Sequence, residues 1–184
     1  WLNDYFRLEG MAYRFVPVKY ESGTGIDYGK VDTEIMYENL MSKFSYGNME
    51  LPEVYLDETN RRLSYNLRTI FGRLANELIV EGENEKAIEV LDFAMEKMPA
   101  EKFGYNYFVF GIIDSYYKAG ATDKARELTN SFANHLDAEL DYFSAFDREN
   151  RKRAANEWRT NLQFYQMLLQ NVQVHDQDSV QDFY

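Results

Sequence analysis

The feature that most constrains the fold is a short stretch that occurs twice, 38 residues apart. Gly82-Glu-Asn-Glu-Lys-Ala87 and Gly120-Ala-Thr-Asp-Lys-Ala125 carry glycine, an acidic residue, lysine and alanine in the same order. On both sides of each stretch, apolar residues recur every three or four positions, which is the pattern of an amphipathic helix. A pattern that returns at a fixed offset is typical of a structural repeat. We therefore expect two helical hairpins.

The predicted hairpins span about 57–98 and 104–143. Asp57 is the expected N-cap of the first helix, and Gly82 the residue just past its end, where a positive φ is cheap for glycine. Pro99 ends the second helix, because proline cannot continue a helix. Thr122 is the expected cap of the fourth helix. A fifth helix, about 147–172, is predicted to cover the end of the stack.

The chain on either side of the helices reads differently. Residues 1–56 form a mixed segment: the end of a helix at 1–8, one short strand within 11–20, a glycine-containing loop at 21–30 and a short amphipathic helix at 31–44. We expect this segment to pack on a helical domain of residues 57–172. Residues 173–184 are polar and acidic, so we predict a frayed tail. The predicted fold class is all-α, with no sheet beyond the one short strand.

The charge balance argues against a nucleic-acid-binding protein. The chain has 20 basic and 31 acidic residues, a formal net charge of −11, whereas a surface that binds nucleic acid is basic. The basic residues that do cluster are Arg148, Arg151, Lys152 and Arg153. They lie in a helical pattern, and a solvated helix face explains them. No apolar run approaches the roughly 20 residues of a membrane span, so we expect no membrane insertion.

The sequence offers no catalytic, cofactor or metal site. The absence of cysteine excludes thiol catalysis and zinc–thiolate sites. His135 and Glu139 have a spacing that two metal ligands can use, but a third ligand is not apparent. His175 falls in the predicted tail. The glycines at 23 and 25 lack the Lys-Ser/Thr of a phosphate loop. We therefore expect this chain not to be an enzyme and to need no cofactor.

The first hairpin resembles a tetratricopeptide repeat, a helix pair of roughly 34 residues. With Arg68 at the first position of the repeat, the matching residues are Phe71, Leu74, Ala75, Leu78, Ala87, Leu91, Ala94 and Pro99. Small residues are needed where the two helices of a pair cross closely. The second hairpin matches less fully, because Thr129 and Phe132 replace the usual aromatic and small residues. The resemblance implies an α-solenoid of tetratricopeptide-like hairpins.

Three further segments carry a second resemblance: Leu8–Pro17, Asp32–Met41 and Tyr55–Arg62. They are similar to the C-terminal soluble region of a family of multi-spanning membrane proteins typical of Bacteroidota. The N-terminal part of that family resembles protein O-mannosyltransferases, which take sugar from a lipid carrier. The resemblance implies a soluble appendage at the periplasmic face of the inner membrane. It transfers no catalytic residue, because the family's expected catalytic acid lies near its first spans. The chain begins at Trp1 instead of Met, so we expect it to be part of a longer protein.

The tetratricopeptide register also predicts a binding surface, because the first helix of each pair lines a concave groove. The candidate groove residues are Arg73 and Asn76 from the first hairpin and Tyr107, Phe110, Asp114 and Tyr117 from the second. This mixture of charged, amide and aromatic side chains suits an extended peptide. The alternative is that these residues pack against the N-terminal segment or the capping helix.

The function predicted from these features is that of a non-catalytic interaction or scaffold domain. Attached to a membrane glycosyltransferase-like protein, it would bind an acceptor protein, a partner subunit, a glycan or a peptide of the parent's own membrane portion. The alternative is a purely structural appendage that packs on the parent's own loops and has no free ligand.

Overall fold

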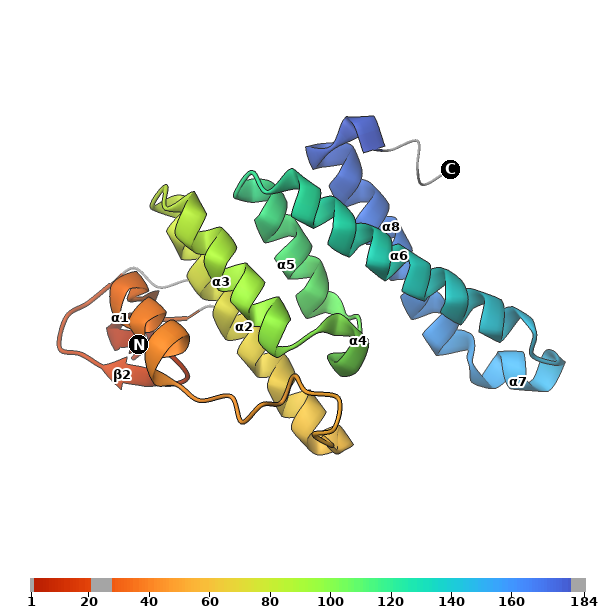
Figure 1. Cartoon of the computed structure of the whole chain (residues 1–184), viewed down its shortest axis with the longest axis horizontal. Coiled ribbons are helices and arrows are strands. Elements are labelled where there is room, and N and C mark those ends of the chain that lie inside the picture. Colours follow the sequence, from red (N-terminus) through yellow and green to blue (C-terminus); the bar gives the residue numbers. More distant parts are fainter. Residues whose placement is uncertain (1, 21–27, 180–184) are drawn as a thin grey trace. The chain divides into compact units, whose positions relative to one another are not determined.

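The structure is a computed structural model that describes residues 2–20 and 28–179 (Figure 1). It is mostly helical, which confirms the predicted all-α class. The chain divides into two compact units, Trp1–Gly104 and Tyr105–Tyr184. This division falls between the two predicted hairpins, whereas the sequence suggested a boundary near residue 56.

The helical part of the first unit is the hairpin of α2 (Glu58–Val80) and α3 (Asn84–Lys97). Asp57 caps α2 as predicted, since its carboxylate accepts a hydrogen bond from the backbone N–H of Asn60 at 2.7 Å. The apolar stripes of the two helices face each other and form the core, whose fully buried members include Phe71, Leu74, Ala75, Ala87, Val90, Leu91 and Ala94. Pro99 ends this pair and begins a further short helix, α4 (Ala100–Phe103), that the sequence did not predict.

A buried arginine fixes the end of the first hairpin. Arg68, on the inner face of α2, is only 1% exposed. Its guanidinium donates to the backbone carbonyls of Met98 at 2.8 Å and Gly104 at 2.9 Å, and it lies over the ring of Phe103. Arg68 therefore ties the chain before and after α4 to the middle of α2.

The turns of the two hairpins have the same backbone hydrogen bonds. In the first, Gly82 donates to Ile79 at 3.1 Å and Glu83 donates to Leu78 at 2.8 Å. In the second, Gly120 donates to Tyr117 at 3.0 Å and Ala121 donates to Tyr116 at 2.9 Å. These donors and acceptors lie 38 positions after those of the first turn. Both glycines have a positive φ, 82° and 83°, as this helix-ending motif requires. The repeat predicted for the turns is confirmed.

The N-terminal segment of the first unit corrects two predictions. Instead of a helix over residues 1–8, it has a 3₁₀ turn, η1 (Asn3–Tyr5), followed by a strand, β1 (Phe6–Leu8). This strand lies between β2 (Tyr13–Phe15), to which it is antiparallel, and β3 (Lys30–Val31), to which it is parallel. A three-stranded sheet therefore replaces the single strand that was expected, because β1 pairs along both of its edges. Most of the predicted loop at 21–30 lies outside the described residues.

A short helix completes this segment, as predicted. Asp32 caps α1 (Thr33–Glu38) by accepting from the backbone N–H of Ile35 at 2.9 Å. The helix continues as one π-helical turn, η3 (Asn39–Lys43). It buries Met36 and Leu40 and packs against α2.

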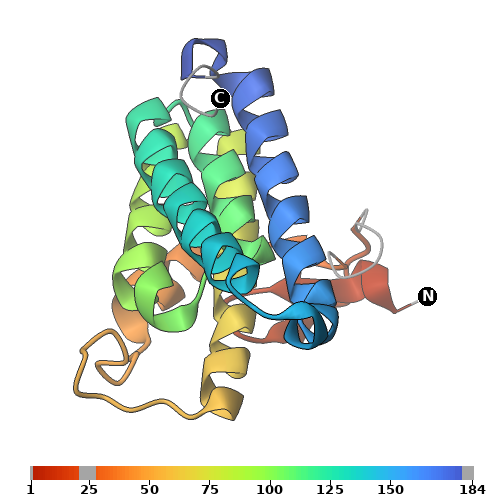
Figure 2. The ribbon, with the colours of Figure 1, turned by 90° about the vertical axis from the view of Figure 1, so that its right-hand side faces the viewer.

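The second unit contains α5 (Tyr107–Lys118), α6 (Thr122–Ser144), α7 (Arg148–Arg153) and α8 (Ala155–His175). Helices α5 and α6 form the second hairpin, and α8 packs along both of them (Figure 2). The last helix was predicted to be continuous over 147–172. It is broken at Ala154, whose backbone leaves the helical region and separates α7 from α8. Thr122 is not a cap: Ala121 occupies the cap position without a side-chain hydrogen bond.

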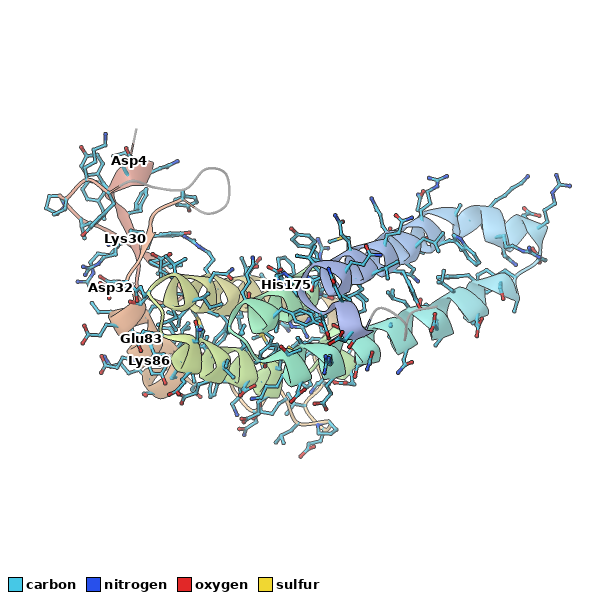
Figure 3. The ribbon with its side chains drawn as sticks, turned by 90° about the horizontal axis from the view of Figure 1, so that it is seen from above. Asp4, Lys30, Asp32, Glu83, Lys86 and His175 are labelled. Atoms are coloured by element: carbon cyan, nitrogen blue, oxygen red, sulfur yellow. The ribbon has the colours of Figure 1, made fainter. Side chains whose placement is uncertain are left out.

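Helix α6 extends well past its partner in the hairpin. It has 23 residues and α5 has 12, which correspond to about 34 Å and 18 Å. Tyr105, just before α5, stacks on Phe132 and His135. Within the second unit, α6 continues past the start of α5 toward α7 and the start of α8 (Figure 3). We call residues 137–161 the arm. Phe143 is the only buried residue within it.

The tail predicted from residue 173 begins later than expected, because α8 continues to His175. Asp176 is only 5% exposed, and its two carboxylate oxygens accept hydrogen bonds from the Arg126 guanidinium at 2.5 and 2.7 Å. This ion pair fixes the end of α8 to the start of α6. The prediction of a frayed tail is therefore wrong at His175 and Asp176, because it overlooked this distant partner. Residues 180–184 lie outside the described part of the chain.

Candidate functional site

The six candidate groove residues are divided between the two units. Arg73 belongs to the first, where its guanidinium donates to the hydroxyl of Tyr13 and to the backbone carbonyl of Tyr28 at 3.1 Å. It also lies over the Tyr13 ring, which stacks on the ring of Tyr28. Arg73 therefore holds the N-terminal segment against α2. Asn76, one turn further along α2, is exposed.

Asp114 of α5 is the centre of a polar cluster in the second unit. Its carboxylate forms an ion pair with Lys118 at 2.5 Å. It accepts a hydrogen bond from the side-chain amide of Asn171 at 3.0 Å, and Nε2 of His175 lies 3.3 Å away. Both of the latter residues belong to α8, so Asp114 joins α5 to α8. Neither was singled out in the sequence as a partner of Asp114, because 57 or more residues separate them from it.

Tyr117 lies next to this cluster and is buried, with only 7% of its surface exposed. Its ring stacks on the imidazole of His175, with an interplanar angle of 7° (Figure 3 labels His175 at the end of α8). Burial raises the pKa of the Tyr117 hydroxyl above its ordinary value. The ring is therefore part of the packing between α5 and α8.

Phe110 and Tyr107 have different surroundings although both belong to α5. Tyr107 is 62% exposed. Phe110 is half-buried and lines an open cavity of about 330 Å³ between α5 and α8. We call this cavity the α5–α8 pocket; its lining residues are Phe110, Asp114, Met167, Gln170, Asn171, Val174 and His175. Of the six candidates, Phe110 and Asp114 thus share one pocket, and Tyr117 packs beside it.

The α5–α8 pocket combines an apolar wall with hydrogen-bonding groups. Phe110, Met167 and Val174 supply the apolar surface, while Gln170 and Asn171 supply amides. The ionisable groups are held by each other, since Asp114 is contacted by Lys118 and His175. Such a lining can accept a side chain together with the backbone amide of a bound peptide.

The histidines are placed by aromatic neighbours. His135 stacks on Tyr105, with ring centroids 4.8 Å apart, and His175 stacks on Tyr117. Within the described residues, no group of three or more His, Asp or Glu side chains is arranged to hold a metal ion. None of the described helices is long and apolar enough to cross a membrane.

Comparison of the chain with protein-family models, with curated proteins and with solved structures finds no match.

Proposed function

We propose that this chain is a non-catalytic interaction domain that binds a short protein segment in the α5–α8 pocket. The observation that carries the proposal is the lining of this pocket. Phe110 offers a half-buried aromatic wall beside the amides of Gln170 and Asn171, and the amide of Asn171 is held in place by its hydrogen bond to Asp114. A rigid aromatic anchor site with polar neighbours is the usual form of a peptide-binding hot spot.

A tetratricopeptide-like arrangement of the hairpins is part of the proposal. The identical hydrogen bonds of the two turns support it. So do Ala87 and Ala125, which occupy equivalent positions in α3 and α6 and are both fully buried. Small buried residues at these positions allow the two helices of each pair to approach closely, as in tetratricopeptide repeats.

The cellular setting of the proposal rests on sequence resemblance. In it, the domain is the soluble C-terminal appendage of a Bacteroidota membrane protein whose N-terminal part resembles protein O-mannosyltransferases. The domain would face the periplasm, and the bound segment would belong to an acceptor protein or to the parent's membrane portion. Sequencing the full gene tests this setting directly, because upstream membrane spans are required.

A second candidate is a purely structural appendage without a free ligand. This candidate is favoured because two of the predicted groove residues already bind other residues of the same chain. Arg73 is engaged by the N-terminal segment, and Asp114 is engaged by α8.

The two candidates are separated by truncating Phe110. If the pocket binds a partner, Phe110→Ala lowers affinity for the detergent-solubilised membrane portion encoded by the same gene. The expected loss is about 2 kcal/mol or more, and the melting temperature changes little. A pull-down or biolayer interferometry beside a thermal melt gives both values.

Tyr55→Ala is the control, because this aromatic residue is 87% exposed and lies outside the pocket. It should leave binding unchanged. A Phe110→Ala protein that binds normally would remove the pocket from the proposal. Loss of about 3–5 kcal/mol of stability in that variant, as expected for a core aromatic, would favour the structural candidate.

A further inference from the structure

The arm has a cleft of its own, lined by three helices. Phe143 and Ser144 come from the end of α6, Arg151 from α7, and Trp158 and Arg159 from the start of α8. The volume is about 360 Å³, enough for one large apolar side chain with part of its backbone. Two arginines, Phe143 and the indole of Trp158 thus line one cavity.

Few side chains of the arm are buried, although the arm contains several aromatic residues. Phe143 is the only buried residue among positions 137–161, whereas Tyr142 is 63% exposed. The rings of Tyr142, Phe143 and Phe146 contact each other. An apolar surface that two helices and a short third one leave partly open is where a partner gains most by excluding water.

The two charged residues that line the cleft, Arg151 and Arg159, are both basic, although the arm as a whole has six acidic and five basic residues. Residues 148–159 hold five basic and two acidic side chains, while the whole chain has a net charge of −11. Among the described residues, the only ion pair of these five cations joins Arg153 to Glu149 at 3.4 Å. Arg151 donates through Nε to the carbonyl of Phe146 at 2.7 Å, and it lines the cleft. Neither Arg151 nor Arg159 forms an ion pair among the described residues. Arg151 lies near Asp147, whose pKa is lowered by backbone hydrogen bonds and by this arginine.

The shape and composition of the arm select the kind of partner. Binding to a lipid surface needs a helix with an apolar face opposite its basic one. The sequence of α7, RENRKR, has no apolar residue, and the aromatic surface forms a concave cleft instead of a projecting wedge. A cavity for one apolar side chain, flanked by cations, matches a peptide in which acidic residues surround an aromatic or large aliphatic residue.

We propose that the arm cleft is a second docking site, which takes an acidic peptide segment with one apolar anchor residue. The anchor enters between Phe143 and Trp158, and the flanking carboxylates pair with Arg151, Arg159 and the cations of α7. This site is separate from the α5–α8 pocket, and either can fail without the other.

The test follows the fluorescence of Trp158 in a Trp1→Phe background, where it is the sole tryptophan. The probes are three eight-residue peptides. Two are acidic, made of Asp, Glu and Ser around a central Phe or a central Ala. The third is basic, with Lys flanking a central Phe. The Phe-centred acidic peptide should shift Trp158 emission saturably and weaken with salt. The Ala-centred peptide should bind at least tenfold more weakly, and the basic peptide should not bind.

Arg159→Glu should lower affinity for the Phe-centred acidic peptide at least tenfold. Its matched control is Arg61→Glu, the same charge change at an exposed position of α2, which should have less than a twofold effect. Equal binding of the Phe and Ala peptides, or equal effects of the two charge reversals, would overturn the proposal. So would binding to phosphatidylserine vesicles in the absence of any peptide binding.

Discussion

The α2–α3 hairpin of the first unit and the α5–α6 hairpin of the second have the same turn but different second helices. Four backbone hydrogen bonds coincide at an offset of 38 residues, yet α3 has 14 residues and α6 has 23. The position that corresponds to Pro99 is Asp137. Proline stops α3 there, whereas aspartate allows α6 to continue for about two more turns.

Two differences at equivalent positions separate a closed hairpin end from an open one. In the first unit, the chain turns back at Pro99, and Arg68 binds the carbonyls on both sides of α4. In the second, the residue that corresponds to Arg68 is Asn106, which caps α5 instead. The free continuation of α6 then forms the arm with α7 and α8. Two hairpins can thus share the same turn while their far ends differ: one end is packed against the chain, and the other is exposed.

The largest expected effect comes from removing the residue that closes the first hairpin. Arg68→Ala should destabilise the protein by about 3 kcal/mol or more, because the buried carbonyl of Met98 and the part-buried carbonyl of Gly104 lose their donor and a cavity remains. Arg61→Ala, on the exposed side of the same helix, should change stability by less than about 0.5 kcal/mol. Urea unfolding of both variants measures the difference. Similar small effects for both would mean that Arg68 does not close this end.

The equivalence of the two turn regions can be tested with a pair of overpacking substitutions. Ala87→Leu and Ala125→Leu should each cost about 1–3 kcal/mol, since both alanines are fully buried. Thermal melts of the two variants give the values, with Glu85→Leu on the exposed surface of α3 as the control. A tolerated leucine at either alanine would show that the two hairpins do not share one helix-crossing geometry.

A smaller effect on stability is expected from the ion pair between Arg126 and Asp176, which joins α6 to the end of α8. Hydrogen bonding to Arg126 lowers the pKa of Asp176 below its ordinary value. The stability from this pair is therefore present above the unfolded pKa of about 4 and lost as pH falls through the lower folded pKa. The difference in melting temperature between the native chain and Asp176→Asn should shrink between pH 5 and pH 3. A difference independent of pH would mean that charge contributes nothing there.

The parts of the fold that sequence predicted are those set by local patterns. The 3.6-residue periodicity located α2, α3, α5 and α6, and the cap at Asp57 was correct. The strands β1 and β3 have three and two residues, too few for a periodic pattern, and they depend on pairing between distant segments. The backbone carbonyls that Arg68 binds could not be predicted either. Every residue has a backbone carbonyl, so the amino-acid sequence does not mark which ones accept a hydrogen bond.

The candidate site was predicted only in part for a related reason. Helical spacing placed Phe110, Asp114 and Tyr117 on one side of α5, and the structure brings all three to α8. The partners Asn171 and His175 come from a helix whose end was expected near residue 172. The arm cleft was missed because it exists only where the break at Ala154 turns α7 away from α8. The basic residues beside it looked like a solvated helix face.

Hydrogen exchange measured by mass spectrometry tests the contrast between the closed and open hairpin ends most directly. In the free protein, amides of the arm should exchange at least tenfold faster than those of α3, because the arm has one buried residue to stabilise it. Adding the Phe-centred acidic peptide should slow exchange in the arm and leave α3 unchanged. An arm that is as protected as α3 without any partner, or whose exchange the peptide does not alter, would contradict the account.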